Sequence, residues 1–360
     1  MLTSIFITLS FGFFSSSIEA DYDNDGIINE NDICSNTPEN TSVSTNGCPL
    51  IYLDDNGVTL KATDEAIDST GKIILFEGDE ILIVKDWKDI RSLDPPNYKD
   101  DLIVVTTFLN RLEFFCSRPC TISDNFDLSS WDMSNVKSMY FTFWNTIGLK
   151  QDLSKWDVSN VTNMCCMFIC ARSFNKDIGS WDVSSVTNMA GMFYDAYQFN
   201  QDIRLWVVSS VTNMNSMFFN SLNFNQEINL WDVSNVTIMK DMFNGALNFN
   251  KNIGSWKLSK VTNMSGMFSR ATLFNNDNRS SIGSWDVSNV KNMWFMFSTS
   301  QFNGDLSDWN VSNVKIMNYV KVFYPGGGLN VKAITYVLIV ICCLEHGNFK
   351  VKNIKQVKEY

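Results

Sequence analysis

The sequence predicts a repeat solenoid, because more than half of the chain is written as copies of one short unit. A tryptophan recurs once in each copy: five consecutive gaps are 25 residues, the sixth is 29 and the last is 24. The spacing departs from 25 residues only at the last two gaps, so each copy is expected to have one tolerant loop while the rest packs. The eight tryptophans are Trp131, Trp156, Trp181, Trp206, Trp231, Trp256, Trp285 and Trp309.

Each copy is expected to hold a short strand and a short helix. One half reads V-x-x-M-x-x-M-F-x-x-A, as in 161–171, and this spacing of apolar residues fits one side of a helix. Ser159 and Asn160 precede that segment and suit a helix N-cap. The other half, F-N-x-D-I-x-x-W-D-V, is aromatic and β-branched, which favours an extended segment. A single unit cannot bury its apolar face, so eight coils are expected to stack.

Stacking predicts that equivalent residues of neighbouring coils pack on one another, Trp on Trp and Phe on Phe, with Met filling the gaps. The alternative is that the Trp–Asp column is a binding ladder. The Asn of each F-N pair, such as Asn225, is expected to satisfy backbone groups at a turn.

The repeated motif WDVSNVTNM…MF…A…FN.DI is similar to that of BspA-like leucine-rich-repeat surface proteins of bacteria. The resemblance covers about 126–321 and recurs eight times. It implies a leucine-rich-repeat-like solenoid (126–324), displayed outside the cell for adhesion or molecular recognition. It implies no reaction.

The two ends of the solenoid differ from the repeats. Residues 51–125 are expected to form an N-terminal cap with a degenerate repeat, in which Cys116 and Cys120 could close a small loop. Residues 325–360 form a divergent C-terminal tail. Its longest apolar run has 12 residues, against roughly 20 for a membrane span, so a core strand or helix is favoured.

The amino terminus predicts export. Residues 1–20 combine an apolar run with small residues before Ala20, which is the form of a secretory signal peptide, although no Lys or Arg precedes the run. A retained transmembrane helix is the alternative. With the signal removed, no membrane span is expected.

Residues 21–50 predict a small calcium-binding module. Carboxylates alternate from Asp21, Gly26 permits a sharp turn, and the twelfth position carries Asp where Glu is usual. Ca²⁺ takes six to eight oxygen ligands, and this spacing supplies them; an acidic linker is the alternative. The expected ligands are Asp21, Asp23, Asp25, the carbonyl of Ile27, Asn29 and Asp32.

The same segment resembles the thrombospondin type 3 repeat of bacterial surface proteins, in which a DxDxDG loop precedes a CPxTP…GC segment. Ser35 stands here in place of the Pro. The resemblance implies a disulfide between Cys34 and Cys48. Extracellular calcium modules bind at roughly 10⁻⁴–10⁻³ M, so the ion would stiffen the segment.

Composition argues against several functions. The net charge of −11 is unsuited to nucleic acid. The one histidine, His346, lies in the tail, and carboxylates such as Asp182 recur once per coil, which is typical of a scaffold; no enzyme is expected. The nine cysteines are an odd number, so at least one is unpaired.

The sequence therefore predicts a secreted or cell-surface recognition protein that binds an extracellular protein or glycan. A passive structural rod without a specific ligand is the alternative. Large apolar residues at outward positions of the expected helical half favour recognition, and the candidate partner-binding residues are Phe219, Trp294 and Phe295.

Overall fold

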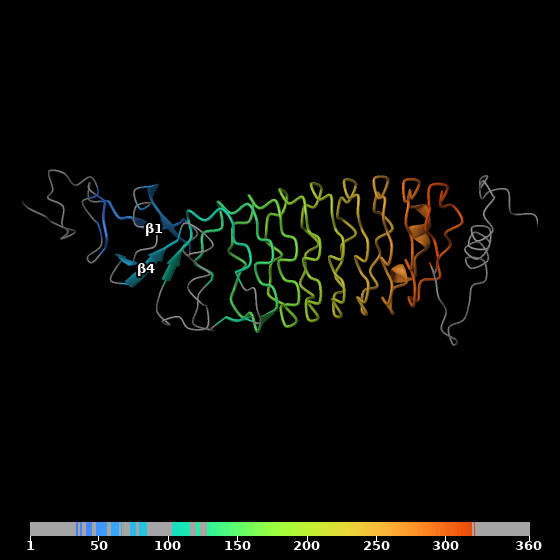
Figure 1. The fold of residues 1–360 in the computed structure, drawn as a ribbon, viewed down its shortest axis with the longest axis horizontal. Helices are drawn as coiled ribbons and strands as arrows, with labels where there is room; N and C mark the ends of the chain where they lie inside the picture. The colour runs from blue at the N-terminus through green and yellow to red at the C-terminus, as the bar shows by residue number, and fades with distance from the viewer. Residues whose placement is uncertain are drawn as a thin grey trace, which may run out of the picture.

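The computed structural model describes residues 128–318 and 320, and before them 34, 37, 41–44, 48–55, 59–64, 66, 73–76, 79–84, 103–115 and 120–122. Figure 1 shows this part of the chain as a long row of stacked coils, with a group of strands at the N-terminal end. The predicted signal peptide, the calcium ligands, Cys116 and the tail 325–360 lie outside the described residues.

The N-terminal strands form three small sheets. Strands β1 (Ile51–Leu53) and β2 (Leu60–Ala62) pair antiparallel. Strand β4 (Asp79–Ile83) lies between β3 (Ile73–Phe76), to which it is antiparallel, and β5 (Ile103–Val105), to which it is parallel. Strand β6 (Cys120–Thr121) pairs parallel with β7 (Thr146–Ile147).

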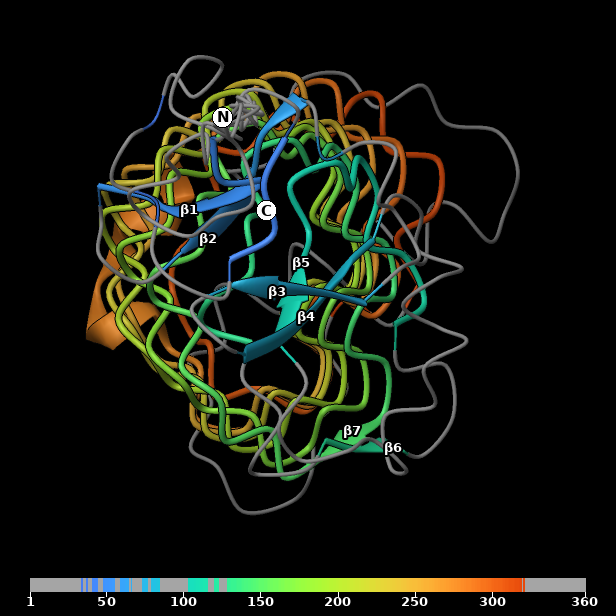
Figure 2. The same cartoon turned by 90° about the vertical axis from the view of Figure 1, so that its left-hand side faces the viewer.

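The sheet that contains β4 closes one end of the coil core. Successive strand residues point to opposite faces. Ile81 and Ile83 accordingly belong to a small N-terminal cluster with Leu50 and Ile51, whereas Leu82 joins the core of the coils. Figure 2 shows β3, β4 and β5 lying across the end of the stack. A cap of this kind covers apolar surface that the first coil would otherwise expose.

Equivalent residues of neighbouring coils lie directly against one another. One backbone bridge per coil joins each coil to the next in parallel, and it recurs at the residue before the first Met of the repeat. The tryptophan rings stack nearly parallel, with centroids 6.5 Å apart for Trp206 and Trp231. The phenylalanine rings do the same, at 5.6 Å for Phe218 and Phe243. The bridged residues are Arg111, Ser138, Asn163, Asn188, Asn213, Ile238, Asn263, Asn292 and Ile316.

The short helix expected in each coil is absent from the described repeats, where residues 161–171 and their equivalents form turns. The reason is where the backbone N–H groups go. Met164, Cys166, Phe168 and Cys170 donate to carbonyls of the following coil, at 2.7–3.0 Å, and these N–H groups cannot also bond within a helix. Carbonyls of the next coil therefore accept the hydrogen bonds that carbonyls of the preceding turn would accept in a helix.

This bonding requires two residues per coil in the left-handed backbone region. In the second coil they are Cys166 (φ 57°) and Cys170 (φ 58°). Gly, Asn and Asp occupy this region most easily, and they recur at the equivalent positions. The other left-handed pairs are Phe141 and Asn145, Gly191 and Asp195, Ser216 and Asn220, Asp241 and Gly245, Gly266 and Arg270, and Phe295 and Thr299.

Ser159 and Asn160 do not cap a helix. The Ser159 N–H donates to Asp157 Oδ1 at 3.0 Å, which closes a local turn. The Asn160 side chain instead donates to the Ser134 carbonyl of the preceding coil at 2.9 Å. Both residues thus support the stack of coils.

The tryptophans belong to the core and also bond across coils. Trp231 is 3% exposed, and its Nε1–H donates to the Ile203 carbonyl at 3.1 Å. Equivalent bonds hold the other tryptophans from Trp156 to Trp309. Such buried rings cannot serve as a binding ladder, so the alternative raised for the Trp–Asp column does not hold for the tryptophans.

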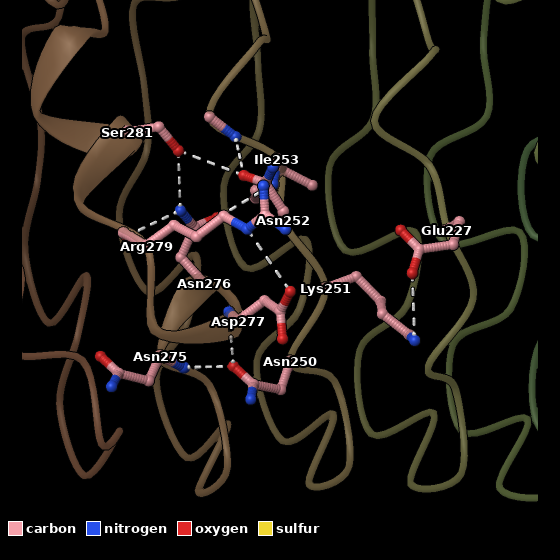
Figure 3. A network of polar contacts seen from close by, with 11 residues as sticks. Glu227, Asn250, Lys251, Asn252, Ile253, Asn275, Asn276, Asp277, Arg279 and Ser281 are labelled. Carbon is pink, nitrogen blue, oxygen red and sulfur yellow. Dashed lines mark hydrogen bonds and ion pairs between the residues drawn. The ribbon is translucent and has the colours of Figure 1, made fainter.

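The asparagines of the F-N pairs form a ladder along another side of the stack. The Asn225 N–H donates to Asn200 Oδ1 at 2.9 Å, and Asn225 Oδ1 in turn accepts from the Asn250 N–H at 3.0 Å. Figure 3 shows the next step of the ladder, from Asn275 to Asn250. Each side chain satisfies a backbone group of its neighbour, as predicted for a turn residue.

The longer copy packs its extra residues against the stack. They form two short 3₁₀ turns, η3 (Asn276–Asn278) and η4 (Ser280–Ser284). Asn276 is fully buried, and its Oδ1 accepts from the Ile253 N–H at 2.9 Å (Figure 3). The insertion is therefore tied to the preceding coil at its buried end, while Asp277 and Arg279 remain exposed.

Candidate interaction face

The structure describes some of the predicted site residues, and others lie outside the described residues. Cys34 and Cys48 are joined in a disulfide with an S–S distance of 2.01 Å. Cys120 begins β6, but its expected partner lies outside the described residues, as do all six expected calcium ligands. Within the described part of the chain, no group of three or more His, Cys, Asp or Glu side chains could hold a metal ion. The same part contains no helix long and apolar enough to cross a membrane.

One side of the stack carries a recurring two-residue position, here called the paired slot. It consists of the two residues that follow the first Met of each repeat, and the second residue has a positive φ. The paired slots are 140–141, 165–166, 190–191, 215–216, 240–241, 265–266 and 294–295.

The left-handed residue brings the two side chains of a paired slot together. In an extended strand, consecutive side chains point to opposite faces. Here the rings of Trp294 and Phe295 meet edge to face, with centroids 4.6 Å apart, and those of Tyr140 and its neighbour Phe141 are 4.5 Å apart. Lys240 Nζ lies 3.8 Å from Asp241 Oδ2 in the same way. These three paired slots thus each present a two-residue surface unit, whereas 190–191 and 265–266, whose second residue is glycine, are buried.

Two of these slots place a bulky residue where the backbone disfavours it. Phe141 has φ 57° and Phe295 has φ 56°, whereas Gly191 and Gly266 occupy the same position in other coils. The left-handed region costs an L-residue roughly 1–2 kcal/mol compared with the right-handed one. The stack requires a left-handed residue at this position in every coil, so the unusual choice is phenylalanine in place of glycine. Residues that carry such strain cluster at functional sites.

A second group of side chains follows the repeated Met-Phe on the same face. The rings of Tyr194 and Phe219 stack with centroids 4.4 Å apart, and the Arg270 guanidinium lies 5.4 Å from the Phe219 ring. Burial and the neighbouring Asp195 carboxylate raise the pKa of Tyr194. Aromatic and cationic side chains of three coils therefore form one continuous surface.

Hydrogen bonds between side chains connect the same region. Asn220 Nδ2 donates to Asp195 Oδ1 at 2.9 Å, and Asn220 Oδ1 accepts from Arg270 Nη2 at 3.2 Å. Arg270 Nε also donates to Asn244 Oδ1 at 3.0 Å, and Asn244 Nδ2 donates to Asp241 Oδ1 at 2.8 Å. Arg270 thus bonds to amide oxygens and forms no ion pair within the described part of the chain, so its positive charge stays available on the surface.

We call this side of the stack, comprising the paired slots and the two residues after each Met-Phe, the interaction face. All three predicted partner-binding residues lie on it. Trp294 is 48% exposed, while Phe219 and Phe295 are half-buried. The sequence prediction missed Tyr140, Phe141 and Arg270. Their places in the repeat would have identified the first two, because they occupy the slot of Trp294 and Phe295.

Comparison with known proteins gives one family match. Three overlapping segments, 114–229, 203–281 and 278–331, match the family described as "Mycoplasma protein of unknown function, DUF285", and together they span more than half of the chain. No curated protein and no solved structure matches the chain.

Proposed function

The chain belongs to the DUF285 family, and we propose that it is a non-enzymatic recognition or adhesion protein that binds an extracellular protein or glycan through the interaction face. The observation that carries this proposal is the aromatic pair formed by the exposed Trp294 and the half-buried Phe295, with Phe295 in a backbone conformation that costs stability. Exposed aromatic clusters usually mark contact surfaces.

A scaffold role for the recurring carboxylates supports a function without catalysis. Asp182 and Asp232 each accept a hydrogen bond from the backbone N–H two residues later, at 3.0 and 3.1 Å. The same turn recurs in other coils, so these carboxylates hold local structure in every copy. A catalytic pair would require two carboxyl groups in special surroundings, placed once.

Placement outside the cell rests on the amino terminus. The disulfide between Cys34 and Cys48 suits an oxidising compartment, and residues 1–20 have the form of a secretory signal. The proposed calcium loop lies between these features. We extend the proposal to a solenoid of the leucine-rich-repeat-like class whose N-terminal segment is stiffened by Ca²⁺.

A passive rod is the competing proposal. The continuous buried core and the ladders between coils would serve a rod equally well. A rod, however, has no need of a strained aromatic side chain on its surface. The two proposals therefore differ in whether replacing Phe295 removes binding to a partner.

The test replaces Phe295 with Gly and Trp294 with Ser, and probes an array of glycans and extracellular-matrix proteins with the full chain. Phe295→Gly removes a left-handed phenylalanine and should leave stability unchanged or raise it by about 1 kcal/mol. Both variants should lose the array binding of the wild type. Leu205→Ser is the matched control, because Leu205 is 72% exposed and lies outside the interaction face.

Destabilisation of Phe295→Gly by more than about 2 kcal/mol would show that the ring packs as core, at the usual cost of a lost core side chain. Binding that survives in both variants, or that Leu205→Ser also removes, would contradict the interaction face. No binding by the wild type to any array member would favour the passive rod.

A further inference from the structure

The paired slot of the second coil holds two cysteines, Cys165 and Cys166, with their sulfur atoms 3.5 Å apart. Both are half-buried and present as free thiols. Adjacent cysteines in an extended strand would point apart. The positive φ of Cys166 (57°) turns the two side chains to the same side, as it does for the ring pairs of the equivalent slots.

We propose that Cys165 and Cys166 form a dithiol–disulfide couple on the interaction face, which a small-molecule disulfide oxidises and a small-molecule thiol reduces. The proposal rests on the short distance between the two sulfurs and on the space that a glycine of the next coil leaves beside Cys166 Sγ. In the next coil the equivalent of Cys166 is Gly191, and a Cβ added there would lie 3.1 Å from Cys166 Sγ. A side chain at residue 191 would therefore crowd the sulfur. The couple does not depend on the proposed adhesion function.

The oxidation proceeds by two thiol–disulfide exchanges. The Cys165 thiolate attacks one sulfur of the small disulfide, whose S–S bond breaks, and the first small thiolate leaves and takes up a proton. The Cys166 thiol then loses its proton and attacks the Cys165 sulfur, which releases the second small thiolate. Two protein thiols are oxidised, and one small disulfide is reduced to two thiols.

The surroundings assign the roles of the three neighbouring cysteines. The hydrogen bond that joins the two thiols, with their sulfurs 3.5 Å apart, lowers the pKa of Cys165, and we therefore take Cys165 as the attacking thiolate. Burial raises the pKa of Cys170, and the Asp195 carboxylate, whose Oδ2 lies 4.0 Å from Cys170 Sγ, raises it further. Cys170 is therefore expected to remain a bystander thiol.

The experiment exposes the reduced full chain to oxidised glutathione, stops the exchange with acid, alkylates the remaining thiols and digests the chain with trypsin. One tryptic peptide, 156–172, contains all three cysteines. In the wild type this peptide should carry an internal disulfide, no glutathione, and the alkyl group on Cys170. Dithiothreitol should restore three alkylated thiols.

Variants separate the two steps. Cys166→Ser should accumulate glutathione on Cys165, because the resolving thiol is gone. Cys170→Ser is the matched control and should form the internal disulfide as the wild type does. The proposal fails if Cys170→Ser loses the disulfide, if Cys166→Ser closes a Cys165–Cys170 bond at the wild-type rate, or if the wild-type peptide keeps glutathione or stays fully reduced.

Discussion

Truncation of Trp231 tests the stacked core directly. The ring is 3% exposed and lies parallel to that of Trp206, with centroids 6.5 Å apart. It also stacks against Phe218 at 6.4 Å and donates from Nε1 to the Ile203 carbonyl at 3.1 Å. Trp231→Ala removes all three interactions in a central coil, where the chain cannot lose the coil by fraying from an end.

The expected loss has two parts. Replacing a buried tryptophan with alanine costs about 3–5 kcal/mol for lost transfer energy and the cavity. The carbonyl left without a partner adds about 1 kcal/mol, the low end of that penalty, because the cavity can admit water. Trp231→Ala should therefore lose about 4–6 kcal/mol. Trp231→Phe keeps an aromatic ring but loses the donor, and should lose less.

Urea denaturation of the full chain, followed by tryptophan fluorescence and circular dichroism, measures these losses. Asp232→Ala is the matched control: the next residue along the chain is exposed, and its hydrogen bonds are local, from the Ser234 N–H at 3.1 Å and from the Ser234 side chain. That control should lose less than about 1 kcal/mol. A Trp231→Ala variant as stable as Asp232→Ala would refute the stacked-core argument.

Three further predictions follow from other parts of the chain. Asn225→Ala should lose about 1–2 kcal/mol in thermal unfolding because the half-buried Asn250 N–H loses its acceptor, while Asn225→Asp should lose less. Hydrogen bonds from the Ser184 side chain and backbone lower the pKa of Asp182 below its ordinary 3.8, so its contribution to stability is complete above that pH and is lost as the pH falls through the lowered value. The stability gap between wild type and Asp182→Asn should therefore shrink in acid; a widening gap would contradict it. Calorimetric titration of the full chain should detect Ca²⁺ binding at roughly 10⁻⁴–10⁻³ M that Asp25→Asn abolishes, and no binding below about 10 mM would leave an acidic linker.

The regular spacing of the sequence was enough to predict the Trp–Trp and Phe–Phe stacks between coils, because a residue that recurs every 25 positions lies beside its own equivalent in the next coil. The role of Asn225 followed in the same way. The backbone conformation of the V-x-x-M-x-x-M-F segment could not be predicted from the spacing, since its apolar pattern fits a helix and a left-handed turn equally well. Gly191 and Gly245 at the two left-handed positions were the available signal against a helix.

Placement on the interaction face was predicted for Phe219, Trp294 and Phe295 but not for Arg270. Single outward residues are visible in a repeat because they depart from its pattern. The Arg270 bonds to Asn220 and Asn244 reach back over two coils, and no spacing in the sequence encodes a bond of that kind.

The hydrogen bonds between coils also give the stack of coils rows of aligned peptide dipoles, and the direction of these dipoles differs from row to row. On the interaction face the backbone N–H groups point toward the C-terminal end, as from Phe168 to the Met192 carbonyl. Elsewhere they point the other way, as from Thr187 to the Thr162 carbonyl. Aligned peptide dipoles add along a row, as they do in a helix. The rows that point the other way therefore offset part of the summed dipole, while a ligand lying along the interaction face meets a potential that grows more positive toward Trp294.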